Sequence, residues 1–170
     1  MKRRAFIGLG ANQGDTAATL TAAVESLRSV ERSTFVAVSG FYKTAPIDAP
    51  GPDFLNAVAR IDTDLEPYSL LLHLLDIEMM LGRKRRANPG PKNAPRKVDL
   101  DLLLVGDLIL RSTPLTLPHP RLHERAFVLR PLLDLEPQLM LPGLGRAADL
   151  LARITDQHIA PAEMPPAGSQ

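Results

Sequence analysis

The segment from 98 to 105 constrains the fold most, because it sets two acids into an otherwise apolar run, VDLDLLLV. Such a run predicts a β-strand. Successive side chains of a strand point to opposite faces, so Asp99 and Asp101 share one face while Leu100 and Leu102 share the other. Two carboxylates this close repel each other, and one tends to stay protonated unless a cation lies between them. The pair is therefore a candidate site for a divalent cation.

A loop rich in Lys and Arg comes directly before this strand. Mg²⁺ binds through one or two carboxylates together with the phosphates of a substrate, so basic side chains next to an acid pair indicate a polyphosphate site. The alternative is an exposed loop that leads into an edge strand with solvated acids. The basic residues are Arg83, Lys84, Arg85, Arg86, Lys92, Arg96 and Lys97.

With 170 residues, of which 45% are apolar and 23% charged, the chain has the composition of a globular protein. We expect one domain over 1–154 and a disordered tail over 155–170, where the sequence has no periodicity. The net charge of +1 provides no general attraction for nucleic acid or membranes. The absence of Cys excludes disulfides and thiolate metal ligands.

No apolar run approaches the about 20 residues that a membrane span requires. The N-terminus also has no apolar segment of signal-peptide length. We therefore expect a cytoplasmic enzyme or binding module that has neither a membrane nor a nucleic acid as its partner. A monomer is the simplest expectation.

Periodic patterns predict the other elements of an α+β fold. Strands are expected at 4–9, 34–42 and 54–61, and helices at about 15–30 and 68–81, the second closed by Gly82. With the acid strand they give the order β-α-β-β-α-β of the ferredoxin-like pattern. This order predicts one antiparallel sheet flanked by helices, a three-layer αβα sandwich. Beyond it we expect residues 108–110 to pair with the acid strand, and short helices at 126–135 and 144–154.

Two further features indicate a binding site. Phe54 and Asn56 share one face of the third strand, and Asn offers both a donor and an acceptor to the edge of a heteroaromatic ring. An Asn that bonds a neighbouring loop is the alternative. His119 lies between two prolines, which stiffen its backbone, although a lone His is more often structural. A dinucleotide-binding loop after Gly10 is disfavoured, because position 13 is Gln where that motif needs Gly.

Seven short motifs follow one another along the chain from about residue 5 to 137. Each motif alone is weak, but the ordered set is specific. They are Gly10-x-Asn12-x-Gly14-Asp15, Phe41-Tyr42-x-Thr44-x-Pro46, Phe54-Leu55-Asn56-x-Val58, Ile77-Glu78-x-x-x-Gly82-Arg83-x-Arg85, Pro95-Arg96-x-Val98-Asp99-Leu100-Asp101, Pro118-His119-Pro120 and Arg125-x-Phe127-Val128-Leu129-x-Pro131-Leu132. In these motifs the chain resembles the 6-hydroxymethyl-7,8-dihydropterin pyrophosphokinases of folate biosynthesis.

The resemblance implies a reaction and a set of catalytic residues. Members of the family move pyrophosphate from ATP, the co-substrate, to the hydroxymethyl oxygen of the pterin and release AMP. By resemblance, Asp99 and Asp101 hold two Mg²⁺ ions. The catalytic residues that the resemblance implies are Arg83, Lys92, Arg96, Asp99 and Asp101.

The resemblance also implies two groups of binding residues. Those for the nucleotide are Glu78, Arg83, Arg85, Arg96, Leu102, Thr116, His119 and Arg125, with Glu78 near the ribose and His119 on the α-phosphate side. Those for the pterin are Thr44, Ala45, Pro46, Ile47, Phe54, Asn56, Asp99 and Phe127, with the two phenylalanines on either side of the ring.

The chain departs from the family pattern in the basic loop. The family commonly has Arg-Trp-Gly-Pro-Arg before the acid strand, whereas this chain has Lys92-Asn93-Ala94-Pro95-Arg96. The segment from 85 to 92 is also about three residues longer than the family pattern. We expect a lid whose closure differs in detail from that of the family.

Three alternatives stay open. An RNA-binding ferredoxin-like module would carry exposed aromatic residues on its sheet, but aromatic residues are only 4% of this chain. A two-metal phosphodiesterase would use the same acids to place a water molecule. A catalytically inactive scaffold is the third, because of the altered loop.

Overall fold

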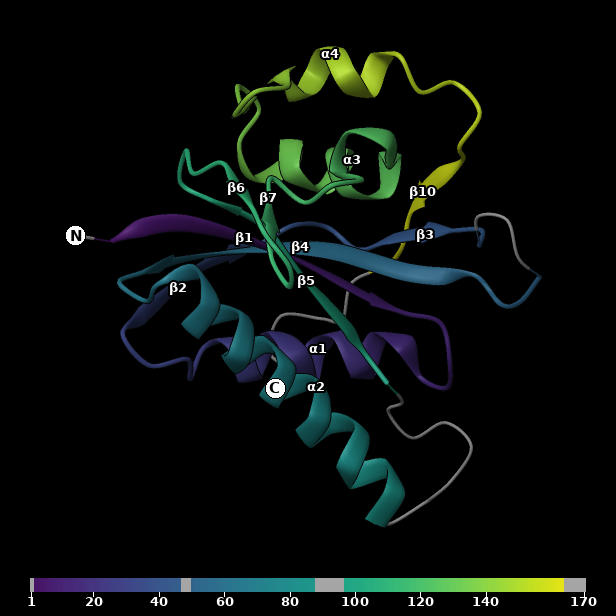
Figure 1. Cartoon of the computed structure of the whole chain (residues 1–170). Coiled ribbons are helices and arrows are strands. Elements are labelled where there is room, and N and C mark those ends of the chain that lie inside the picture. The colour runs from purple at the N-terminus through teal and green to yellow at the C-terminus, as the bar shows by residue number, and fades with distance from the viewer. Residues whose placement is uncertain (1, 47–49, 88–96, 164–170) are drawn as a thin grey trace.

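The computed structural model describes residues 2–46, 50–87 and 97–163, apart from the side chains of 83–87. Its elements run along the chain in an α+β order (Figure 1). They are β1 (Arg3–Ala11), α1 (Thr16–Leu27), β2 (Ser33–Val38), β3 (Tyr42–Thr44), β4 (Phe54–Thr63), α2 (Pro67–Ala87), β5 (Asp99–Val105), β6 (Leu110–Arg111), β7 (Thr116–Leu117), η1 (Leu122–Glu124), α3 (Ala126–Leu135), β8 (Met140–Leu141), β9 (Gly145–Arg146), α4 (Ala147–Ala152) and β10 (Ile159–Pro161).

The main sheet is antiparallel and has the order β10-β3-β4-β1-β5, with β2 also paired to β4. This confirms the predicted ferredoxin-like pattern. The single strand expected at 34–42 is split into β2 and β3, which pair with opposite halves of β4. Between them, the Ser39 N–H donates to the Val58 carbonyl at 2.8 Å, and the Ser39 hydroxyl accepts from the Val58 N–H at 2.9 Å.

Helices cover both faces of this sheet, α1 and α2 on one side and α3 and α4 on the other (Figure 1). Alternate residues of β1 show the two cores: Ile7 packs in the cluster with Leu20 of α1, and Phe6 packs with Leu129 of α3. The two apolar layers follow from the two-residue period of the strands. Within the described residues no helix has the length and apolar character of a membrane span.

Three predicted details are wrong. Helix α2 does not end at Gly82 but continues to Ala87, because the Lys and Arg residues beyond it are good helix formers. The segment at 110–111 pairs with β7 and not with β5. The loop after β7 instead reaches β5 through the His119 N–H, which donates to the Leu103 carbonyl at 2.9 Å. The short helix α4 begins later and ends earlier than the predicted 144–154.

The C-terminal segment differs most from expectation. Residues 155–163, predicted as part of a disordered tail, include strand β10, which pairs with β3 in the register Ile159 to Thr44. The Ala162 N–H also donates to the Phe41 carbonyl at 2.8 Å. The pairing arises because β3 would otherwise leave its outer backbone groups unpaired. Residues 164–170 of that prediction lie outside the described part of the chain.

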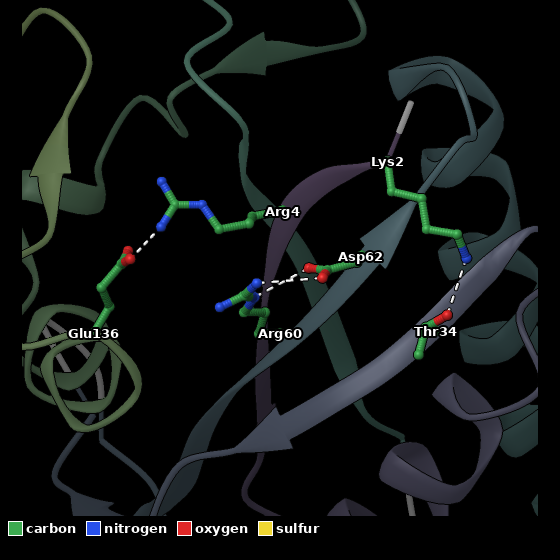
Figure 2. Close-up of polar contacts among 6 residues, drawn as sticks. All are labelled: Lys2, Arg4, Thr34, Arg60, Asp62 and Glu136. Carbon is green, nitrogen blue, oxygen red and sulfur yellow. Dashed lines mark hydrogen bonds and ion pairs between the residues drawn. The ribbon is translucent and has the colours of Figure 1, made fainter.

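One end of the sheet carries charged side chains that are paired with each other (Figure 2). Arg4 of β1 forms an ion pair with Glu136, the residue after α3. On β4, Arg60 bonds Asp62 through two nitrogen–oxygen contacts of 3.1 and 3.3 Å. The Arg4–Glu136 pair connects the sheet to the end of α3, whereas the Arg60–Asp62 pair lies within β4.

Candidate active site

A cavity of about 790 Å³ lies at the opposite end of the sheet, beside the start of α3. It brings together residues from nearly the full length of the chain. They are Gly8, Leu9, Gly10, Thr44, Ala45, Phe54, Asn56, Ala57, Glu78, Asp99, Asp101, His119, Arg121, Glu124, Arg125, Phe127, Val128 and Gln157.

Strand register sets the floor of this cavity. Gly10 of β1 is paired with Asn56 of β4 on one side and with Asp99 of β5 on the other. Gly8, two residues earlier, is paired with Asp101. A Cβ atom on Gly10 would lie 3.0 Å from the Asn56 Oδ1 atom, so any larger residue there would press against Asn56. The two glycines therefore leave room between the acid pair and the amide.

The acid pair lies at the edge of the sheet, on β5. Both side chains are exposed and line the cavity. Although more than half of the Asp99 side-chain surface is exposed, partial burial is the largest influence that raises its pKa; Lys97 lowers it, and the neighbouring Asp101 carboxylate raises it further. The Lys97 Nζ atom is 3.9 Å from Asp99 Oδ1, a loose ion pair. A cation placed between the two carboxylates would remove their repulsion.

A third carboxylate, Glu78 of α2, reaches the same edge. Its Oε2 atom accepts a hydrogen bond of 2.6 Å from the Leu100 N–H, between the two aspartates. Burial raises the pKa of Glu78, the Leu100 N–H lowers it, and Asp99 and Asp101 raise it again. Glu78 thus holds the strand that carries the acid pair.

The donor set can be tested for a metal ion from the described residues. Among them no three acidic or His side chains gather closely enough to hold a metal by themselves. Mg²⁺ commonly takes only one or two protein carboxylates and completes its oxygen shell with water and substrate phosphates. The all-oxygen pair Asp99 and Asp101 fits such a partial ligand set.

The wall opposite the acids combines amide and aromatic groups. Asn56 and Thr44 are 6% and 5% exposed, and the Asn56 Nδ2 atom donates to the Thr44 hydroxyl at 2.7 Å. An amide carries two N–H groups and one carbonyl oxygen, so this bond uses only part of its capacity. Phe54 and Phe127 line the same cavity. The wall suits a flat ring with donors and acceptors on its edge.

The remaining side of the cavity carries basic groups. Arg125 lies between η1 and α3, and its guanidinium carbon is 5.6 Å from the centroid of the Phe127 ring. Arg121 follows His119 in the loop and is exposed. Their positive charges suit an anionic ligand in contact with both the acid edge and the aromatic wall.

The surroundings of His119 favour its neutral form. Burial lowers its pKa, Asp101 raises it, and Arg125 and Arg121 lower it. The Nδ1 atom accepts a hydrogen bond of 3.3 Å from the Arg121 N–H. The neutral ring therefore carries its proton on Nε2, which makes it a hydrogen-bond donor.

Most of the predicted site residues that the structure describes meet in this cavity. Pro46 lines a smaller adjoining cavity of about 260 Å³, which shares Thr44, Ala45 and Phe127 with the main one. Leu102 is buried in the core against α1 and α2, and Thr116 lies on β7 with its hydroxyl bonded to the Ser112 carbonyl; neither lines the cavity. The predicted residues that fall outside the described part are Ile47, Lys92 and Arg96, together with the side chains of Arg83 and Arg85.

Several cavity residues were not predicted. Arg121 could have been included, because it adds a cation directly after the predicted His119 loop. Gln157 had no signal in the sequence, since the segment around it has no periodicity and was expected to be disordered. Its place in the cavity depends on the pairing of β10 with β3.

Comparison with protein families agrees with this geometry. Residues 6–137 match the model of the family described as 7,8-dihydro-6-hydroxymethylpterin-pyrophosphokinase. The chain belongs to this family. The matched range ends before α4 and β10, so Gln157 lies outside it.

Individual relatives of the pyrophosphokinase family support the assignment. A 2-amino-4-hydroxy-6-hydroxymethyldihydropteridine pyrophosphokinase of Haemophilus influenzae is 37% identical over 156 residues, which cover 91% of this chain and 95% of the relative. The enzyme of the same name from Methylorubrum extorquens is 43% identical over 141 residues, covering 82% and 87% of the two chains. These matches span nearly the whole of each relative.

The fold agrees with that of solved pyrophosphokinase structures. A Plasmodium falciparum HPPK-DHPS structure superposes with a TM-score of 0.69 at 14% identity, over 90% of this chain. This chain spans 45% of the length of that one. The likeness shows that the two share a fold.

Proposed function

We propose that this chain transfers pyrophosphate from ATP to the hydroxymethyl group of 6-hydroxymethyl-7,8-dihydropterin, giving the pterin diphosphate and AMP in folate biosynthesis. One observation carries the proposal. A single cavity combines an acid pair, basic side chains and an amide–aromatic wall, in a chain matched to the pyrophosphokinase family over 6–137. Such a cavity suits two ligands at once, a polyphosphate and a flat heteroaromatic ring.

The pterin lies against the wall of β3, β4 and α3 in this proposal. Phe54 and Phe127 stack on its two faces, and Asn56 bonds its edge with the polar groups that Thr44 leaves free. Buried amide groups discriminate strongly between ligands, because the wrong ligand leaves them without partners. The buried Asn56–Thr44 pair supports this assignment.

The triphosphate lies between the acid edge and the basic side of the cavity, where Arg121 and Arg125 lie. Arg125 bonds phosphate oxygens, and Arg can do so with two parallel N–H groups. The neutral His119 donates from Nε2 on the side where AMP leaves. Arg83, Arg85, Lys92 and Arg96 remain predicted phosphate ligands from the segment before β5.

Two Mg²⁺ ions are the proposed metal cofactors, held by Asp99 and Asp101 together with ATP oxygens. When bound, they would neutralise the triphosphate and make the hydroxymethyl oxygen more nucleophilic. The chain's own part is positioning: Glu78 fixes β5 through the Leu100 N–H, so that both aspartates face the cavity. Holding two reactants in line supplies a large part of such a rate enhancement.

Competing functions gain no support from the fold. An RNA-binding module of this topology binds on an open sheet face, whereas helices cover both faces here (Figure 1). A phosphodiesterase would need the acids but has no use for a wall with Asn56 and two phenylalanines. We still expect a monomer that acts in the cytoplasm. The mass of the protein in solution would test whether it is a monomer.

The experiment is a product analysis with ATP, Mg²⁺ and 6-hydroxymethyl-7,8-dihydropterin. The proposal predicts AMP and pterin diphosphate in equal amounts. ADP would show an ordinary phosphoryl transfer, and AMP with free pyrophosphate would show a hydrolase. Binding of both substrates without any turnover would identify an inactive scaffold, and would direct attention to the altered segment at Lys92 and Asn93.

A further inference from the structure

The C-terminal segment contributes one side chain to the main cavity, Gln157. Gln157 is partly buried and lies two residues before β10, where the chain passes from α4 to the edge of the sheet (Figure 1). The strand anchors it, since Ile159 is paired with Thr44 and the Ala162 N–H donates to the Phe41 carbonyl. Its position is therefore fixed by the same sheet that positions the rest of the site.

The amide of Gln157 makes two hydrogen bonds to the main chain at the start of α3. Its Oε1 atom accepts from the Ala126 N–H at 3.0 Å, and its Nε2 atom donates to the Glu124 carbonyl at 2.8 Å. The two bonded groups belong to the residues directly before and after Arg125. Both hydrogen-bonding ends of the amide are thus used on one short stretch of backbone.

Backbone bonds also hold this stretch: the Arg125 N–H donates to the Leu122 carbonyl at 3.4 Å, and the Arg125 carbonyl accepts from the Leu129 N–H at 3.0 Å. Arg125 is in an extended conformation (φ −120°, ψ 108°) between the 3₁₀ turn η1 and α3, and its side chain does not cap the helix. The first amides of a helix have no partner within the helix. Gln157 supplies one for Ala126. Without it, the direction in which Arg125 leaves the main chain would be less well defined.

We propose that Gln157 is a positioning residue, whose amide fixes the main chain on both sides of Arg125 and so directs the Arg125 guanidinium toward the triphosphate. The inference rests on the proposed function for the role of Arg125. The C-terminal segment, which follows the residues matched to the family model, would then take part in nucleotide binding. Gln157 itself acts through Arg125 and transfers no group.

A double-mutant cycle tests the coupling. The dissociation constant of ATP in the presence of Mg²⁺ is measured by calorimetry for the wild type, Gln157→Met, Arg125→Ala and the double variant. Met keeps the length of the side chain and removes both hydrogen bonds. Two bonds of ordinary strength predict that Gln157→Met weakens ATP binding about tenfold in the wild-type background. In the Arg125→Ala background the effect should fall below about twofold.

Gln138→Met is the matched control, because Gln138 is exposed, lies outside the cavity and accepts a bond of 3.4 Å from the Arg146 side chain. It should leave ATP binding unchanged in both backgrounds. Exchange of the Ala126 amide proton should be faster in Gln157→Met and unchanged in Gln138→Met. Melting curves check the fold of every variant, and Gln157→Ala serves as a second removal of the same bonds.

Each outcome either supports or overturns the positioning role of Gln157. Unchanged ATP binding in Gln157→Met, or an equal loss in both backgrounds, overturns the inference, as does an Arg125→Ala protein that binds ATP normally. If the cycle shows the coupling but the wild type forms no pterin diphosphate, the proposed function fails while the positioning role of Gln157 stands. If the wild type is active and the cycle is additive, only the inference fails.

Discussion

The face of the sheet that lies against α3 has charged residues at both ends, arranged in different ways. At one end Arg4 is paired with Glu136 and Arg60 with Asp62 (Figure 2). At the other end Asp99 and Asp101 face a cavity, and the Lys97 Nζ atom is 3.9 Å from Asp99 Oδ1. Between the two ends lie apolar residues of the core that packs against α3, among them Phe6 on β1 and Val58 on β4.

The difference shows how to separate charges that support the fold from charges that serve a ligand. The paired charges have their partners within the protein, so they do not require a ligand to neutralise them. The two aspartates raise each other's energy instead, as the upward effect of Asp101 on the pKa of Asp99 shows. A protein keeps such an arrangement at a cost in stability, which a bound cation removes.

The largest effect is expected from the acid pair. Asp101→Asn should lower kcat by about a thousandfold, because the neutral amide lacks the negative charge of the proposed metal ligand, which removes several kcal/mol of charge stabilisation. Steady-state assays of AMP release measure it, with Asp107→Asn as the matched control. Asp107 is exposed in the turn after the same strand and lies outside the cavity. Full turnover by Asp101→Asn would refute the metal assignment.

The amide wall should show the next largest effect, and it should be specific for one substrate. Asn56→Ala removes the proposed edge contacts of the pterin and leaves the Thr44 hydroxyl without its present donor. The KM for the pterin should rise roughly 10- to 100-fold. The KM for ATP is the internal control and should change less than about twofold. Equal increases in both constants would mean that Asn56 supports the cavity as a whole and does not recognise the pterin.

The cost of holding Asp99 partly buried beside Asp101 should appear in the stability of the protein without ligands. Because the pKa of Asp99 is raised in the fold, the folded state binds its proton more tightly than the unfolded state does. The penalty is therefore absent below about pH 3.8, where both states are protonated, and present above the folded pKa. Asp99→Asn should raise the melting temperature at pH 7 by a few degrees at most, with little gain near pH 3.

The paired end supplies the opposite control. Asp62→Asn removes an acid that is bonded to Arg60, so it should leave the melting temperature at pH 7 unchanged or lower it. Thermal melts of both variants at pH 7 and pH 3 make the comparison. A decrease in stability for Asp99→Asn at pH 7 would show that its carboxylate is already well paired in the fold.

The smallest effect is expected at the paired end. Arg4→Met breaks the ion pair with Glu136, and exposed pairs of this kind contribute about 0.2–1 kcal/mol. Denaturant unfolding should show a loss within that range, and kcat/KM should stay at the wild-type value. A clear loss of activity in Arg4→Met would mean that the two ends are coupled through α3.

The order of the main elements could be predicted from the sequence, because long periodic segments determine it. The acid strand, the strand with Asn56 and helix α2 all have patterns that extend over several residues. Short pairings were missed for the opposite reason. Strands β6, β7 and β10 have two or three residues each, and only their tertiary neighbours determine them. Gly82 does not predict the end of α2, because the helix formers after it extend the helix to Ala87.

The candidate site was predictable in its chemistry and less so in its geometry. The motifs identified Asp99, Asn56, His119 and Arg125, but nothing in the sequence states the register that pairs Gly10 with both Asn56 and Asp99. That register determines the floor of the cavity. The place of Gln157 in the site could not be predicted, because its two hydrogen bonds go to main-chain atoms and a sequence motif does not indicate such bonds.

The most direct test of the account is a Mg²⁺ titration in the presence of α,β-methylene-ATP, an analogue in which the bond to be broken cannot react. Melting temperatures of the wild type are compared with those of the Asp99→Asn/Asp101→Asn double variant, with EDTA to remove the metal. The account predicts that Mg²⁺ raises the melting temperature of the wild type, that EDTA reverses the rise, and that the double variant does not respond. An equal rise in both proteins, or no rise in the wild type, would contradict a metal site at the acid pair.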